Sequence, residues 1–188
     1  MSVNLSWLTN QFLLGLPLLP DAFFSRSVVY ICEHNAKGAI GLVINRPLSL
    51  NLAQVFKRLK IDTQHAWADE QPVLCGGPVH PERGFVIHTP PGTWQSSLCM
   101  DSKICVTVSE DILSAIARNQ GPAHAMFSLG YVSWTSGQLE KEIHQDYWLV
   151  MPADLDILFT VPFTKRWKVA MLQLGVDVTK LVYVGGHV

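Results

Sequence analysis

The chain has 188 residues, of which 48% are hydrophobic and 15% are charged, and its formal net charge is −1. This length is typical of one domain, and the hydrophobic share can fill a substantial core, so we predict a single domain over residues 1–188. The two signs of charge are balanced and neither forms a long run, so the sequence lacks the basic stripe of nucleic-acid-binding proteins and does not support direct nucleic acid binding.

The first apolar run, residues 12–20, is not typical of a signal peptide or a membrane span. No Lys or Arg precedes it, and Pro17 and Pro20 interrupt it, whereas a signal peptide has a positive start and an unbroken apolar stretch. No segment approaches the ~18 apolar residues of a membrane helix. We therefore predict a cytoplasmic protein without membrane contact.

The chain up to residue 108 predicts a hairpin, a helix and three further strands. Residues 27–33 and 38–45 are β-branched, nearly continuously apolar, and separated by a short polar loop, which is typical of a hairpin with two covered faces. Apolar residues recur with helical spacing over about residues 51–60. The remaining strands are predicted over residues 73–75, 85–89 and 103–108.

In the second half, Ser109 is a predicted N-cap for a helix that ends at Gly121-Pro122. Strands follow over residues 125–131 and 147–151, and helices over residues 138–144 and 163–174. Asp154 is a predicted N-cap of a short helix before Phe159. These elements predict an α+β fold, with a strongly curved, mostly antiparallel sheet and about three to four helices packed around it.

The segment from Cys75 to Thr89 concentrates glycine, proline, histidine and arginine between two apolar runs. Its Gly76-Gly77 pair could present backbone N–H groups to an anion, with charge added by Arg83. The lysine and hydroxyl residue of a phosphate-binding loop are missing. A tight corner of the sheet is the simpler interpretation, because glycine supplies unusual φ angles there.

Other chemistry-bearing residues form no complete catalytic or metal-binding pattern. The seven histidines lack zinc-type spacing, so we expect no metal and no cofactor. Glu140 and His144 can touch on one helix, yet no matched nucleophile accompanies them. The four cysteines also lack metal spacing, and we expect all of them to be reduced, with Cys75 the best candidate for a reactive thiol. They are Cys32, Cys75, Cys99 and Cys105.

Many short stretches together resemble the YqgE/AlgH family of bacterial proteins, over nearly the whole chain. They are residues 26–35, 38–41, 45–47, 76–78, 83–90, 129–131, 137–140, 148–149, 152–154, 157–159, 166–167, 175–177 and 186–187, with Trp134. The resemblance implies an α+β fold whose sheet curls into an open pseudo-barrel. It also implies a link to transcriptional regulation for some members, but no catalytic residues.

The leading hypothesis is a non-enzymatic regulatory or binding module, because no catalytic constellation is complete. The low charged fraction leaves apolar surface for a protein partner, a small ligand or weak self-association. The alternative is an enzyme with hydrolase-like or thiol-dependent activity centred on the Gly-Gly-Pro turn. The candidate ligand or partner surface consists of His34, Asn45, Gly76, Gly77, Arg83 and His88.

Overall fold

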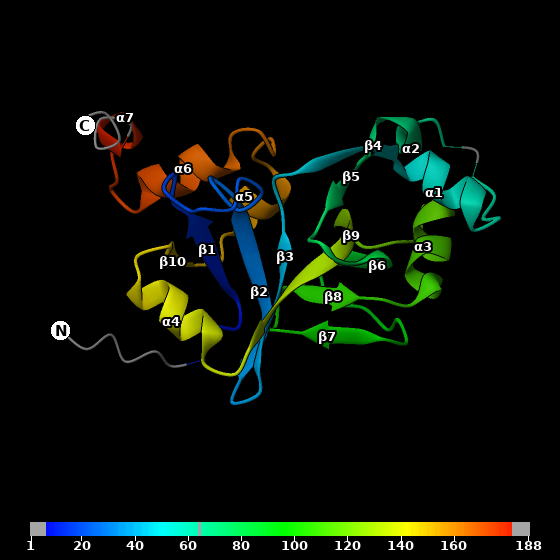
Figure 1. The fold of residues 1–188 in the computed structure, drawn as a ribbon. Coiled ribbons are helices and arrows are strands. Elements are labelled where there is room, and N and C mark those ends of the chain that lie inside the picture. Colours follow the sequence, from blue (N-terminus) through cyan, green and yellow to red (C-terminus); the bar gives the residue numbers. More distant parts are fainter. Residues whose placement is uncertain (1–6, 64, 182–188) are drawn as a thin grey trace. The chain divides into compact units, whose positions relative to one another are not determined.

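The computed structural model describes residues 7–63 and 65–181 (Figure 1), so the family stretch at 186–187 lies outside the described residues. Contacts divide the chain into two compact units. Unit 1 consists of residues 1–45 and 133–188, and unit 2 of residues 46–132. The single domain over residues 1–188 stays a prediction.

Unit 1 is built on four antiparallel strands in the order β10-β1-β2-β3. The predicted hairpin is formed by β2 and β3, and both strands are buried along most of their length, which explains why both of its faces are apolar in sequence. The strands are β1 (Gln11–Gly15), β2 (Val28–Asn35), β3 (Gly38–Val43) and β10 (Trp148–Pro152). The helices are α4 (Gln138–His144), α5 (Leu155–Phe159), α6 (Arg166–Gln173) and α7 (Val178–Leu181).

Unit 2 carries strands in the order β4-β5-β9-β6-β8-β7. All pairs are antiparallel except β5 with β9. The strands are β4 (Pro47–Asn51), β5 (Pro72–Cys75), β6 (Val79–Thr89), β7 (Ser97–Cys99), β8 (Cys105–Thr107) and β9 (His124–Thr135), whose last three residues belong to unit 1. The helices are α1 (Leu52–Arg58), α2 (Trp67–Glu70) and α3 (Glu110–Ala117).

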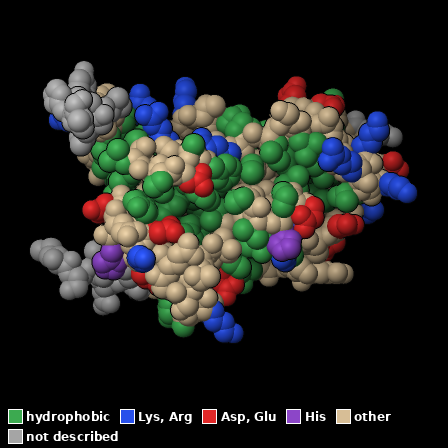
Figure 2. All heavy atoms as spheres, viewed as in Figure 1, with side chains coloured by type: hydrophobic (Ala, Val, Ile, Leu, Met, Phe, Trp, Pro, Cys, Tyr) green, Lys and Arg blue, Asp and Glu red, His purple; other side chains and the backbone are tan. Residues whose placement is uncertain are grey.

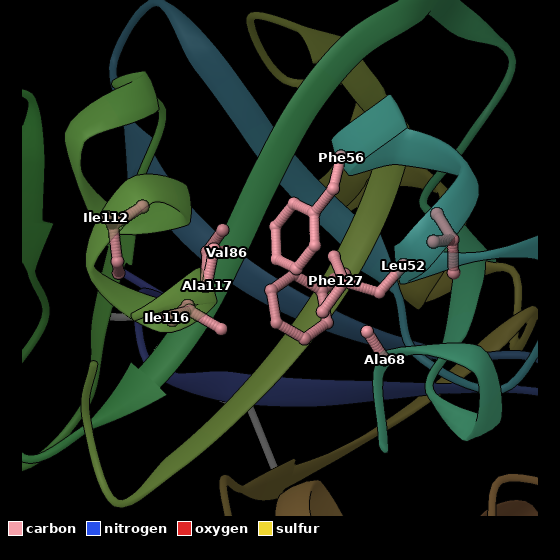
Figure 3. Packing of buried hydrophobic residues seen from close by; sticks show 9 residues of the cluster. Leu52, Phe56, Ala68, Val86, Ile112, Ile116, Ala117 and Phe127 are labelled. Carbon is pink, nitrogen blue, oxygen red and sulfur yellow. The ribbon is translucent and has the colours of Figure 1, made fainter. Parts of the chain in front are cut away.

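The core of unit 2 lies where α1 and α3 pack on one face of this sheet. The Phe56 ring of α1 faces the Phe127 ring of β9, with Ile116 of α3 beside them (Figure 3). Phe56 is fully buried, and burying a side chain of this size contributes about 1.5–3 kcal/mol. The sheet therefore has a helix-covered face on which side chains of β6 and β9 meet those of two helices.

The fold class is α+β with a mostly antiparallel sheet, as predicted. The helix number differs, because the described residues contain seven helices, not three or four. Helices α2 and α7 were not predicted, because each has only four residues and is too short to show helical periodicity. Asp154 caps α5 as predicted, since its side chain accepts from the Ile157 N–H. No helix in the described part of the chain is long and apolar enough to cross a membrane.

Candidate functional site

The Gly-Gly-Pro turn packs directly on the backbone of β9. The N–H of Gly76 donates to the Leu129 carbonyl at 2.7 Å. Gly77 has φ +157°, and a Cβ there would come within 2.2 Å of the Tyr131 carbonyl oxygen. The turn is thus a close backbone crossing in which the Gly76 N–H already has a protein acceptor.

Immediately after the turn, β6 is irregular. Its register with β9 shifts between Val79 and Gly84, and an irregularity of this kind bends the strand. His80 bonds the Glu82 carboxylate at 3.0 Å, and hydrogen bonds from the Glu82 backbone and from His80 lower the pKa of Glu82. The Arg83 guanidinium lies over the Phe85 ring at 5.6 Å. His80, Glu82 and Arg83 are exposed, and each contacts another residue of β6.

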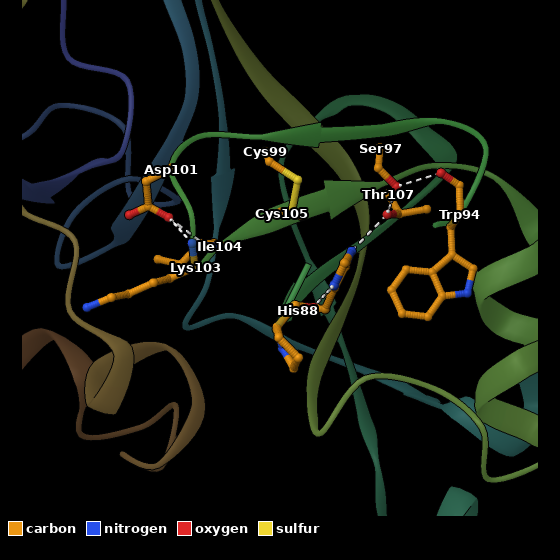
Figure 4. Close-up of a disulfide and its surroundings, with 10 residues drawn as sticks. His88, Trp94, Ser97, Cys99, Asp101, Lys103, Ile104, Cys105 and Thr107 are labelled. Carbon is orange, nitrogen blue, oxygen red and sulfur yellow. Dashed lines mark hydrogen bonds between the residues drawn. A yellow bond between two sulfur atoms is a disulfide. The ribbon is translucent and has the colours of Figure 1, made fainter. Parts of the chain in front are cut away.

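His88 is the centre of a polar chain in unit 2 (Figure 4). Its ring is fully buried, and it bonds the Pro90 carbonyl through Nδ1 and the Thr107 hydroxyl through Nε2, at 3.1 and 2.8 Å. The Thr107 hydroxyl also contacts the Ser97 hydroxyl at 2.6 Å. Burial lowers the pKa of His88, which keeps the imidazole neutral near pH 7.

The two candidates in unit 1 also have protein partners. Nδ1 of His34 accepts from the Leu8 N–H at 3.0 Å, so Nε2 carries the proton and donates to the Glu140 carboxylate at 3.0 Å. The Asn45 side chain accepts from the Val28 N–H at 2.9 Å. Of the six predicted site residues, His34 and Asn45 thus belong to unit 1, and Gly76, Gly77, Arg83 and His88 to unit 2.

A cavity of about 380 Å³ lies on the helix-covered face of unit 2. It borders the Cys75–Thr89 segment through Pro81, Glu82 and residues 84–86. Its apolar lining from strands, α1 and α3 includes Leu50, Leu52, Val55, Leu59, Val73, Val86, Leu113, Phe127 and Leu129. The sequence analysis missed this cavity. A usable signal was the wide apolar stripe of α1 and α3, which carries more apolar residues than the core encloses.

Charges line this cavity only through Arg58, Glu82 and Glu110, and all three residues are exposed. Glu82 is paired with His80, while within the described chain Arg58 and Glu110 have neither an ion pair nor a side-chain hydrogen bond. Inside, the Thr107 hydroxyl is used by His88 and Ser97. The interior therefore presents apolar surface, and the open charges lie at the rim.

Ser128 also borders the cavity, and its buried hydroxyl is the one buried side-chain N or O atom in the described residues without a hydrogen bond. Side chains alternate along a strand, so this hydroxyl lies on the opposite sheet face from Phe127 and Leu129.

Elsewhere on the surface, hydrophobic patches are interspersed with scattered charges of both signs on the face shown in Figure 2.

The prediction of four reduced cysteines is wrong for one pair. Cys99 and Cys105 form a disulfide, six positions apart in sequence, between directly opposed residues of β7 and β8 (Figure 4). Because the three-residue strand β7 was not predicted, nothing in the sequence indicated that the two thiols face each other. Cys32 and Cys75 are free. Burial, and then the charge of Glu33, raise the pKa of Cys32 to about 12.

No cluster of three or more His, Cys, Asp or Glu side chains suited to a metal ion occurs among the residues that the structure describes. The Cys75 thiol contacts the Gly77 carbonyl oxygen at 3.9 Å, and the described chain gives it no histidine partner. The fold and site thus define an α+β protein with an apolar cavity beneath two helices of its second unit.

A family profile described as AlgH-like matches residues 12–179, and the chain belongs to this family. It is 48% identical over 183 residues to the UPF0301 protein lpl0620 of Legionella pneumophila strain Lens, covering 97% of this chain and 98% of that one. It is 49% identical to the UPF0301 protein Tgr7_2910 of Thioalkalivibrio sulfidiphilus, covering 95% and 96%.

Two solved structures share the fold. The solution structure of the AlgH protein from Pseudomonas aeruginosa is 41% identical, with TM-score 0.81 and 97% of each chain covered. Protein DIP2367 from Corynebacterium diphtheriae is 18% identical, with TM-score 0.69 and 93% and 90% covered, and shows likeness of fold alone.

Proposed function

We propose that this chain is a non-enzymatic binding module whose ligand is a small molecule with an apolar body, held in the cavity under α1 and α3. The observation that carries the proposal is the cavity itself. Its volume of about 380 Å³ falls within the roughly 300–1,000 Å³ of small-molecule sites, which are mostly apolar inside with a few polar groups.

The rim of the cavity suggests where a polar end of the ligand would lie. Arg58 stands in the last turn of α1 and Glu110 in the first turn of α3, and each lacks a partner within the described residues. A ligand with an apolar body and one charged or polar end would bury the body and leave that end beside these two side chains. Exposed charges of this kind favour orientation and specificity more than affinity.

A regulatory role would act through a protein partner. The net charge is −1, and direct nucleic acid binding would require a basic surface that the sequence does not supply. A link to transcription, as the family resemblance implies, therefore fits a ligand-responsive cytoplasmic protein that contacts another protein.

The enzyme alternative has less support. Catalysis by Cys75 requires a base or a positive group that favours its thiolate. In the described residues the thiol contacts a carbonyl instead, while His80 is paired with Glu82 and His88 with Thr107. These contacts favour the binding module.

Filling the cavity tests the proposal. Leu113 is a half-buried lining residue of α3, and we expect Leu113→Trp to weaken binding of the apolar fluorophore 1-anilinonaphthalene-8-sulfonate at least about tenfold, or 1.4 kcal/mol. The matched control is Leu172→Trp, at a side chain that is 56% exposed on α6, which should leave the affinity unchanged. Equal affinities of the two variants would contradict the proposal.

A further inference from the structure

The two cysteines of the Cys99–Cys105 disulfide differ in their exposure to solvent. Cys99 is exposed on β7, whereas Cys105 is fully buried on β8. In the described chain β8 is the only strand that pairs with β7. A protein thiol can therefore approach the bond from the Cys99 side, at the edge of the sheet.

The two residues Ser96 and Ser97, shortly before Cys99, form hydrogen bonds to residues that line the cavity. Ser96 accepts from the Val108 N–H at 3.0 Å and donates its own N–H to the Ser109 hydroxyl at 3.1 Å. Ser97 contacts the Thr107 hydroxyl at 2.6 Å. Residues 107–109 all line the cavity, so the segment that the disulfide anchors also holds one side of the ligand site.

We propose that the Cys99–Cys105 disulfide is a thiol–disulfide exchange site for a dithiol protein of the thioredoxin class, and that its redox state controls the cavity. The control of the cavity rests on the proposed function, whereas the exchange site does not. Cytosolic disulfides are rare and mostly catalytic or redox-sensing, so an exposed bond on an edge strand of a cytoplasmic protein fits a regulatory role.

The exchange proceeds in two displacements. A thiolate of the partner attacks Sγ of Cys99, a mixed disulfide forms, and Cys105 leaves as a thiolate that takes up a proton. The second thiolate of the partner then attacks the partner's first sulfur, which is bonded to Cys99 in the mixed disulfide. Cys99 leaves as a thiolate and is protonated in turn. Two electrons and two protons pass to this chain, and the partner ends as a disulfide.

Reduction removes the covalent link at the end of β7 that the short loop of residues 100–104 joins to β8. Besides this loop, the three-residue strand then keeps its hydrogen bonds to β8, those of the Ser96 backbone and those of the Ser97 side chain. Fraying of a short edge strand has a low free-energy cost, and it would release the bonds to residues 107–109. The reduced protein should therefore bind an apolar ligand more weakly than the oxidised protein.

The test compares oxidised and reduced full-length protein. Thioredoxin with its NADPH-dependent reductase should raise the thiol count of the denatured chain from two to four, since two of the four cysteines are free beforehand. Binding of 1-anilinonaphthalene-8-sulfonate should weaken at least about fivefold, the lower end of typical coupling between two sites. Cys99→Ala should bind like the reduced protein, and Cys75→Ser should behave like the wild type in both states.

Amide hydrogen exchange gives a second readout that does not need the fluorophore. The Val108 and Met100 amides, bonded to Ser96 and Ile104, should lose protection on reduction, while the Val28 amide of unit 1 should not. A thiol count that stays at two overturns the exchange site. Full reduction with unchanged affinity overturns the control of the cavity, and an oxidised protein that binds no fluorophore overturns the proposed function together with that control.

Discussion

The carboxylate of Glu142 in α4 holds two buried indoles. Nε1 of Trp134 and Nε1 of Trp148 both donate to Oε2 at 2.9 Å, and Nε2 of Gln138 donates to Oε1 at 3.0 Å. The two rings pack edge to face with centroids 6.0 Å apart. An ionised carboxylate only accepts hydrogen bonds, so it can satisfy all three donors at once.

Glu142→Gln keeps the shape of this side chain but replaces one oxygen with an NH₂ group. If the remaining oxygen stays with the indoles, the new amide meets the NH₂ of Gln138, donor to donor. Turning Gln138 over would cost the bond that its oxygen accepts from the Thr135 N–H at 3.0 Å. With about 1–3 kcal/mol for each weakened charged bond or unsatisfied donor, we expect the free energy of unfolding to fall by about 2 kcal/mol.

Urea denaturation followed by tryptophan fluorescence measures this change. The matched control is Glu33→Gln in the same unit, where the exposed carboxylate accepts from the Asn35 side chain and a glutamine oxygen can do the same. The control should stay within about 0.5 kcal/mol of the wild type. The reasoning is refuted if the two variants have equal stability.

Three other predictions concern backbone and buried polar groups. Gly77→Ala should destabilise the protein by more than Gly137→Ala, because a Cβ at 77 would meet the Tyr131 backbone at 2.2 Å while one at 137 meets nothing within 4 Å; equal denaturation midpoints would contradict this. The pKa of His88 is lower in the folded protein than its ordinary value. The stability that the neutral imidazole supplies is therefore complete above about pH 6.5 and falls as the pH drops below that value. His88→Gln should flatten this pH dependence of the free energy of unfolding, measured by denaturation between about pH 7.5 and pH 5. Arg166→Met should lower the free energy of unfolding by about 2–4 kcal/mol, because the guanidinium donates to three backbone carbonyls, including that of Leu158 at 2.7 Å. A thermal midpoint within about 2 °C of the wild type would contradict this prediction.

Elements with strong local signals could be predicted from the sequence. Helix α4 has the predicted bounds, Gln138–His144, and the strands around the Cys75–Thr89 segment occur where the apolar runs indicated. Local chemistry also identified the cap of α5 at Asp154. These features depend on neighbours within one or two turns of the chain, which a sequence displays directly.

Features that depend on distant residues could not be predicted. The disulfide required the register of β7 on β8, and the three residues of β7 carry no period that separates a strand from a loop. The cavity required α1, α3 and residues of five strands to meet with space left between them. The apolar stripes of the two helices are visible in the sequence, but the space between the elements is not. The ring of His88 bonds Thr107, which lies 19 positions away in the chain, so the sequence did not indicate this partner.

The ligand cavity is tested most directly by an NMR titration of the oxidised, ¹⁵N-labelled protein with 1-anilinonaphthalene-8-sulfonate. The largest amide shift changes should fall on residues around the cavity in unit 2, such as Val55, Leu113 and Leu129. The same titration of Leu113→Trp should remove them. Changes concentrated in unit 1, or unaltered by Leu113→Trp, would contradict the account.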